Sequence, residues 1–322
     1  MAINLTHSEI ITLRPAQPFH FDGTFRKSSH FPVPFRHHEP GKYWQTLTWD
    51  GEVLGIRMTT GGTGENPEIE LTVYSGHRLP ESVLDGVVAE LTARFDLDAD
   101  LRPFVDGLAG EPVLGAAIGR WAGMRVSSSY SLYEFLAVAV VLQNTTVRRS
   151  AQMLAALFEE FGTRVAFDGR ELFAFWRPGA VAGAGEQRLR ELKLGYRAKT
   201  LHRIAEAFEA GTVDETAIRA LPPSERRRRL LQIYGVGPAS VSYLLFEVFH
   251  HYDAFDTLPP WEQKIYSRLL FDEERVPAEK ILAEAAHRWG EWRMLAAHYL
   301  FEDLFWRHAR EEIPWLRALI RL

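Results

Sequence analysis

The sequence contains no cysteine among its 322 residues. Disulfide bonds are therefore excluded, and so is an iron–sulfur cluster held by cysteine thiolates. The chain also lacks a run of eighteen apolar residues, and its first fifteen residues do not follow the basic and then apolar order of a signal peptide. We therefore expect a cytoplasmic protein that has no membrane partner.

Positive charge is scarce in total, because 37 Lys and Arg residues stand against 42 Asp and Glu residues and give a net charge of -5. Proteins bind nucleic acids largely through cations, so the total argues against such a partner. Two local clusters argue the other way. Residues 187–203 hold six basic side chains and one acidic side chain, and residues 226–229 are four consecutive arginines. A solvated helix face is the other interpretation of the arginine block.

A hydrophobic fraction of 46% and a charged fraction of 25% indicate a globular chain, and 322 residues suffice for two domains. In residues 1–122 we predict a small antiparallel-sheet domain of mixed α/β type. Asp50-Gly51 favours a two-residue hairpin between strands at 43–50 and 52–59, and residues 68–74 alternate like a further strand. Apolar residues at helical spacing predict a helix over residues 80–95.

Residues 123–322 are predicted to form an all-helical domain with two lobes, so the whole fold is α+β. Residues 131–143 are nearly all apolar, as a central buried helix requires, and residues 145–161 follow an amphipathic pattern. The break between these helices falls on Asn144, a residue type that suits turns and caps. Later helices are expected near Leu201, Arg226, Pro260, Pro277 and Glu291.

The second domain is organised around residues 231–245, which predict a helix, a tight hairpin and a second helix. The hairpin is Gly235-Val236-Gly237, and Pro238 then occupies the first position of the second helix. Glycines allow positive φ angles and let an external group approach bare backbone N–H groups. A helix start of this kind can bind an anion such as phosphate. An ordinary turn between two helices is the alternative.

Three further segments agree with the hairpin in order and spacing, namely residues 143–146 (QNTT), 194–199 (LGYRAK) and 289–293 (WGEWR). Together the four segments resemble the helix-hairpin-helix DNA glycosylase superfamily over about residues 124–306. The similarity is closest to the 3-methyladenine DNA glycosylase II and 8-oxoguanine glycosylase branch. Residues 18–21 (PFHF) also resemble the start of the TBP-like sheet domain of that branch.

This resemblance implies a monomeric base-excision-repair enzyme that acts on double-stranded DNA. Such an enzyme flips a damaged purine nucleotide, alkylated or oxidised, and hydrolyses its N-glycosidic bond. The family's hairpin amides hold a backbone phosphate, often with a Na⁺ or K⁺ ion, and we expect no other cofactor and no metal bound by side chains. The residues that correspond to DNA-binding positions are Gln143, Asn144, Thr145, Tyr196, Arg197, Lys199, Gly235, Gly237 and Ser240.

Asn144 has two interpretations. In relatives, a residue at this turn enters the space that the flipped nucleotide leaves, and an asparagine performs this role in the 8-oxoguanine enzymes. A cap for the helix that begins at Thr145 is the other interpretation.

The family's catalytic aspartate corresponds to Glu262, because Ile265 and Arg268 follow it at the family's spacing. Two departures leave the assignment open: glutamate replaces aspartate, and the loop before it is about three residues longer. Either the longer loop accommodates the longer side chain, or Asp256 folds back into the site. Glu262 can also be interpreted as a first-turn glutamate that only favours the helix dipole.

Relatives that also cleave the DNA strand have a lysine two residues after the second hairpin glycine. This chain has Ala239 there, so the resemblance implies a glycosylase without lyase activity. Ala239 also reshapes the base pocket, for which Trp261 and Phe301 are the aromatic candidates together with Tyr196. A non-catalytic protein that binds damaged or kinked duplex DNA through the hairpin is the alternative function.

Overall fold

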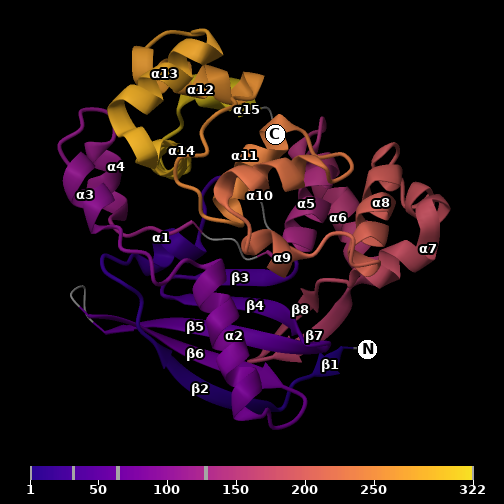
Figure 1. The fold of residues 1–322 in the computed structure, drawn as a ribbon. Coiled ribbons are helices and arrows are strands. Elements are labelled where there is room, and N and C mark those ends of the chain that lie inside the picture. The colour runs from indigo at the N-terminus through magenta and orange to yellow at the C-terminus, as the bar shows by residue number, and fades with distance from the viewer. Residues whose placement is uncertain (1, 31–32, 63–65, 127–129, 321–322) are drawn as a thin grey trace.

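The computed structural model describes residues 2–30, 33–62, 66–126 and 130–320. These residues form two sheets at one end of the molecule and a helical body at the other (Figure 1). This order confirms the predicted α+β class. The strands are β1 (Ile3–Asn4), β2 (His7–Leu13), β3 (Arg36–Glu39), β4 (Lys42–Trp49), β5 (Glu52–Gly62), β6 (Pro67–Ser75), β7 (Thr163–Phe167) and β8 (Arg170–Ala174).

The larger sheet has the strand order β2-β6-β5-β4-β3, and all its neighbours are antiparallel. At the predicted turn, Trp49 pairs with Glu52, while Asp50 and Gly51 have positive φ angles of 45° and 86°. A two-residue hairpin whose twist matches its strands needs such angles. Helix α2 (Glu81–Arg94) lies across this sheet (Figure 1) and buries its apolar side against it. The predicted hairpin and helix are confirmed.

The helical body has two lobes with separate cores. The remaining helices are α1 (Phe21–Phe25), α3 (Arg102–Leu108), α4 (Gly115–Trp121), α5 (Leu132–Leu142), α6 (Val147–Phe161), α7 (Pro178–Glu191), α8 (Arg197–Glu209), α9 (Glu215–Arg219), α10 (Pro223–Leu231), α11 (Pro238–Glu247), α12 (Pro260–Phe271), α13 (Ala278–Trp289), α14 (Arg293–His308) and α15 (Pro314–Ile320). The helices predicted after residue 196 are all present. Among the described helices, none has the length and apolar character that crossing a membrane requires.

One core joins α5 through α10 and most of α11, and the other joins α3 and α4 to α12, α13 and α14. Helix α11 contributes to both cores, because Phe246 packs in the second one. The second helix of the hairpin therefore connects the two lobes. The domain boundary at residue 122 stays a prediction, and the two helices that precede it pack with the second lobe.

The hairpin of β7 and β8 was not predicted and interrupts the expected all-helical domain. It turns at Asp168-Gly169, whose φ angles of 48° and 71° repeat the geometry of the first hairpin. Strand β1 adds to it in parallel, so the smaller sheet has the order β1-β7-β8. Asp168 accepts hydrogen bonds from Trp44 at 2.7 Å, Tyr74 at 2.9 Å and Arg57 at 3.0 Å. The two sheets are thus fastened to each other through one carboxylate.

Candidate active site and DNA-binding surface

The predicted hairpin joins α10 to α11 and depends on the conformation of Gly235. Its φ angle is 79°, a region that residues with a Cβ rarely adopt. A Cβ at this position would also lie 2.5 Å from a methyl group of Thr200 in α8. Glycine is therefore required here for two reasons, and the hairpin packs against the start of α8.

The second hairpin glycine has a different role. Gly237 is the N-cap of α11 with extended backbone, and no side chain caps the helix. A Cβ at Gly237 would meet nothing within 4 Å, so this stretch of backbone is open to an external group. Because Pro238 has no N–H, the unpaired donors of the first turn belong to Ala239 and Ser240. Such donors at the positive end of a helix dipole form an anion site.

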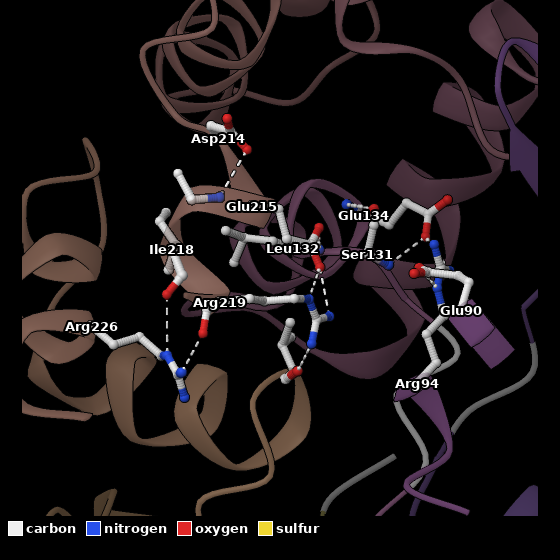
Figure 2. A network of polar contacts seen from close by, with 12 residues as sticks. Glu90, Arg94, Ser131, Leu132, Glu134, Asp214, Glu215, Ile218, Arg219 and Arg226 are labelled. Atoms are coloured by element: carbon white, nitrogen blue, oxygen red, sulfur yellow. Dashed lines mark hydrogen bonds and ion pairs between the residues drawn. The ribbon is translucent and has the colours of Figure 1, made fainter. Parts of the chain in front are cut away.

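A polar network fixes the hairpin to the first lobe (Figure 2). Glu215 accepts hydrogen bonds from the Leu132 N–H at 2.7 Å and from Arg219 at 2.6 Å. Arg219 in turn donates to the Val248 carbonyl, at the end of α11, at 3.1 Å. Arg226 on α10 donates to carbonyls of the α9 segment (Figure 2). Both helices of the hairpin are therefore held in place before any ligand arrives.

The arginine block at residues 226–229 serves mainly this anchoring. Arg229 donates to the Thr212 carbonyl, and Arg227 binds Asp256. Only Arg228 extends into solvent with 70% of its side chain exposed. The four arginines therefore form neither a continuous surface that could face DNA nor a fully solvated helix face.

The turn that contains Asn144 lies between α5 and α6. Asn144 is exposed and has a φ angle of 47°, which asparagine tolerates better than most residues. The N-cap of α6 is Thr146, whose hydroxyl accepts the Arg149 N–H at 3.3 Å. The interpretation of Asn144 as the helix cap is therefore wrong, because the N-cap lies two residues after Asn144 and α6 starts at Val147. Thr145 lies within the same turn.

The start of α8 meets this turn. Arg197 donates to the Gln143 carbonyl, and the hydroxyl of Tyr196 donates to the same oxygen at 3.4 Å. Arg197 is buried, whereas Tyr196 is 56% exposed and Lys199 is also exposed. The structure thus brings the predicted DNA-binding residues of the first lobe together at the turn before α6. Arg197 has a structural role there, whereas Tyr196 and Lys199 are accessible to a ligand. Thr200 links the same helix start to Gly235.

Glu262 lies in the first turn of α12, yet only 8% of its surface is exposed. Tyr243 on α11 donates its hydroxyl to Oε1 of Glu262 at 2.5 Å, and no other described residue hydrogen-bonds this carboxylate. Burial raises the pKa of Glu262 to about 7, although the hydrogen bond from Tyr243 lowers it. A glutamate that served only the helix dipole would gain nothing from such burial. The carboxylate is instead suited to proton transfer or to stabilising positive charge near neutral pH.

Asp256 lies in a different environment. Its two oxygens bind Arg227 and Arg293, the latter at 3.3 Å, and 39% of its side chain is exposed. A carboxylate that already pairs with two guanidinium groups is a weaker stabiliser of external positive charge. These contacts favour Glu262 over Asp256 as the reactive acid.

Aromatic surface lies beside Glu262. The rings of Trp261 and Phe301 meet edge to face with centroids 5.7 Å apart, and Trp261 is 44% exposed. Ala239 lies one turn before Tyr243 on the same face of α11, since residues four apart share a helix face. The predicted pocket residues therefore come from α11, α12 and α14; Tyr243 of α11 contacts the carboxylate, and Phe301 of α14 packs on Trp261 next to it in the chain.

Sequence reasoning missed Tyr243, and it missed a buried charged group formed by Lys27, Glu247 and Glu302. The spacing of four residues from Ala239 to Tyr243 and on to Glu247 was a signal that could have been used. Within the described ranges, no group of three or more His, Asp or Glu side chains could hold a metal ion. A surface hollow of about 620 Å³ between α2 and the α9 segment contains none of the predicted site residues and no stacking aromatic ring.

Comparison with known proteins agrees with this geometry. Residues 137–296 match the family described as HhH-GPD superfamily base excision DNA repair protein. The DNA-3-methyladenine glycosylase of Bacillus subtilis is 24% identical over 215 residues, which are 66% of this chain and 70% of that protein. A probable bifunctional transcriptional activator/DNA repair enzyme AlkA of Mycobacterium tuberculosis is 26% identical over 299 residues. That match covers 89% of this chain but 55% of the relative, so the chain spans about half of its length.

Two solved structures share the fold over nearly the whole chain. A 3-methyladenine DNA glycosylase from Archaeoglobus fulgidus superposes with a TM-score of 0.74 at 19% identity, covering 94% of this chain and 99% of that one. An 8-oxoguanine glycosylase/lyase of Clostridium acetobutylicum superposes with a TM-score of 0.68 at 20% identity and the same coverage. The matched residues include the hairpin, Asn144 and Glu262, and the chain therefore belongs to the HhH-GPD superfamily of base excision DNA repair proteins.

Proposed function

We propose that this protein is a monofunctional DNA glycosylase that extrudes a damaged purine nucleotide from duplex DNA and hydrolyses its N-glycosidic bond. The observation that carries the proposal is Glu262, a buried carboxylate with one hydrogen bond, next to exposed aromatic surface and the hairpin helix. Breaking an N-glycosidic bond develops positive charge on the sugar. A carboxylate in a poorly solvated site stabilises that charge far better than water does.

In the proposed reaction, the bond between C1′ and the base nitrogen breaks and its electron pair leaves with the base. The sugar gains oxocarbenium character, and the ionised Glu262 stabilises it. A water oxygen then bonds to C1′, and Glu262 accepts the proton that this water loses. An oxidised purine leaves as an anion and takes up a proton from solvent, whereas a cationic alkylated purine leaves as a neutral base and needs none. Tyr243 holds the carboxylate in place through its hydroxyl.

DNA contacts are assigned to three parts of the described surface. The N–H groups at Gly237, Ala239 and Ser240 bind a backbone phosphate, because they are unpaired and open to approach. Lys199 adds a cation near the hairpin. Asn144, exposed at the turn before α6, fills the space left by the extruded nucleotide.

The absence of strand cleavage follows from Ala239. A Schiff base with the sugar needs an amine, and a methyl side chain at this position cannot supply one. We therefore infer that hydrolysis by water is the only route and that the product is an intact strand with an abasic site.

The test is a panel of duplexes that each carry one lesion, alkylated or oxidised, incubated with the protein and assayed for free base and for strand breaks. Release of a free base with no strand break before alkali treatment supports the proposal. Strand breaks that borohydride traps as a covalent adduct would contradict the monofunctional mechanism. Lesion-dependent binding without release of any base would instead identify a non-catalytic DNA-binding protein.

A further inference from the structure

A second carboxylate, Glu247, lies in line with the proposed active site. Ala239, Tyr243 and Glu247 follow each other at intervals of four residues on α11, so they form one stripe along that helix. Ala239 is exposed near the hairpin, while Tyr243 and Glu247 are partly buried. Tyr243 holds Glu262, and the charges of both Glu262 and Glu247 raise the pKa of its hydroxyl further above the level that burial produces. Glu247 is therefore one helical turn deeper than the group that positions the catalytic carboxylate.

The neighbours of Glu247 already have partners of their own. Lys27 is buried and donates to the carbonyls of Arg125 at 2.7 Å and Gly23 at 3.0 Å. Glu302 accepts the Ser29 hydroxyl at 2.5 Å and the Ser29 N–H at 3.2 Å. Both groups are held rigidly and neither forms an ion pair with Glu247 in the described structure.

Glu247 itself has no such partner. In the part of the chain that the structure describes, no residue donates a hydrogen bond to its carboxylate. Burial raises the pKa of Glu247 to about 7 against the opposing effects of Lys27 and Arg36. The oxygens of this carboxylate are not among the enclosed atoms of the described residues, so an external group can reach them. Such carboxylates are commonly satisfied by a ligand at functional sites.

Helix α14 contributes His298 and Glu302, which are also four residues apart, to the same charged group. The Nε2 atom of His298 is buried and has no hydrogen-bond partner among the described residues. Lys27 contributes to the shifts in pKa of both Glu302 and His298, which places all three within electrostatic reach of one another. The unpaired Nε2 atom of His298 and the carboxylate of Glu247, which has no donor among the described residues, therefore belong to the same charged group and come from two helices.

We propose that Glu247 is a specificity-determining residue, whose carboxylate accepts hydrogen bonds from adjacent N–H donors on the edge of the extruded base. This inference rests on the proposed glycosylase function. An ionised carboxylate can only accept hydrogen bonds, and its two oxygens match two neighbouring donors. A guanine-derived base offers such a pair, the ring N1–H and the 2-amino group. An adenine-derived base offers an acceptor, N1, beside its amino group, and the carboxylate repels that acceptor.

The preference can be measured on one substrate. Duplex DNA treated with dimethyl sulfate carries both 7-methylguanine and 3-methyladenine, and chromatography separates the two free bases. Wild-type protein, Glu247→Gln and the exposed control Glu279→Gln are compared at pH 8, with spontaneous release from DNA alone subtracted. Glu279 is the second residue of α13, and it is exposed and makes no hydrogen bond or ion pair with the described residues of the cluster, so its replacement removes a solvated charge.

Glu247→Gln keeps one acceptor oxygen but replaces the other with an N–H donor, which cannot pair with the second of the two adjacent donors, so we expect release of 7-methylguanine to fall at least tenfold. Release of 3-methyladenine should not fall, because the amide no longer repels its N1 atom, and the control should match the wild type for both bases. Should Glu247→Gln fail to fold, Glu247→Asp, which withdraws the carboxylate by one methylene group, is expected to give a selective loss of at least threefold.

An equal loss for both bases would overturn the proposal, because it would mean that Glu247 only balances the charge of Lys27. Release of 3-methyladenine alone by the wild type would also overturn it while leaving the glycosylase function intact. If the wild type releases no base from this DNA or from the lesion panel, the proposed function and this inference fail together.

Discussion

Replacing Glu262 by glutamine should stabilise the folded protein at alkaline pH, even though it removes the proposed catalytic group. Glutamine is close in shape to protonated glutamate, and its carbonyl can still accept the hydroxyl of Tyr243. The pKa of Glu262 is about 7 in the folded chain because of burial, against an ordinary value of 4.5. A raised carboxyl pKa means that the folded state binds this proton more tightly than the unfolded state does. The stabilising contribution is complete below pH 4.5 and is lost as the pH rises through 7.

The size of the effect follows from the two pKa values. At pH 5 Glu262 is partly ionised in the unfolded chain but almost fully protonated in the folded chain. The free energy of unfolding of the wild type is then about 0.8 kcal/mol lower than at a pH where both states are protonated. At pH 8 this decrease in the free energy of unfolding reaches about 3.3 kcal/mol, because both states are then mostly ionised. The stability of Glu262→Gln relative to wild type should therefore increase by about 2.5 kcal/mol between pH 5 and pH 8.

Urea denaturation of both proteins at the two pH values measures this difference, and Glu279→Gln serves as the control for a solvated glutamate. The same Glu262→Gln protein should bind lesion-bearing duplex but release no base. A stability difference that does not change with pH would refute the reasoning, since Glu262 would then titrate like a solvated carboxyl. A difference that shrinks toward pH 8 would mean that the ionised form is favoured by partners that the geometry does not reveal.

Four further predictions concern the surroundings of Glu262. Tyr243→Phe removes the hydrogen bond that lowers the pKa of Glu262, so the pH at which base release is half-maximal should rise above that of the wild type; an unchanged pH profile would contradict this. Asp256→Asn should change base release by less than about twofold and reduce the free energy of unfolding by about 1 kcal/mol, as expected for exposed ion pairs; loss of activity would make Asp256 the reactive acid. Gly237→Val should weaken binding to damaged and undamaged duplexes alike, by roughly tenfold for one lost phosphate contact in a titration assay, and a loss confined to one lesion would show that the hairpin reads bases. Asn144→Ala should slow base release from duplex while sparing single-stranded substrate, whereas equal slowing of both would assign Asn144 a structural role.

The sequence predicted the hairpin because its signals are local. Gly235 and Pro238 each impose a backbone geometry on their own, and the helices on either side have strong apolar periodicity. Glu262 could be located only through a motif register. Its burial and its bond to Tyr243 depend on how α12 packs against α11, which no local pattern encodes.

Two features escaped the sequence for different reasons. Asp168-Gly169 carried the same turn signal as Asp50-Gly51 but lay within a stretch that reads as helical, and its outer partner is β1 at the other end of the chain. The lack of a donor for Glu247 is a property of three segments together, because Lys27 donates to backbone carbonyls and Glu302 accepts from Ser29. Long-range pairing and hydrogen-bond satisfaction appear only once the fold is assembled.

The parallel pairing of β1 with β7 also governs the order in which the chain can mature on the ribosome. Ile3 is hydrogen-bonded in register with Val165, so the first strand must wait until about 160 further residues have been synthesised. Until then the five-stranded sheet can close, but β7 has no strand on its outer side. A fragment that begins at residue 123 would keep that edge bare permanently, and bare edges pair with other chains. Attempts to produce the helical part alone should therefore yield aggregates, and a separately supplied peptide of residues 1–13 would cover only the bare edge, because α3 and α4 also complete the core of the second lobe.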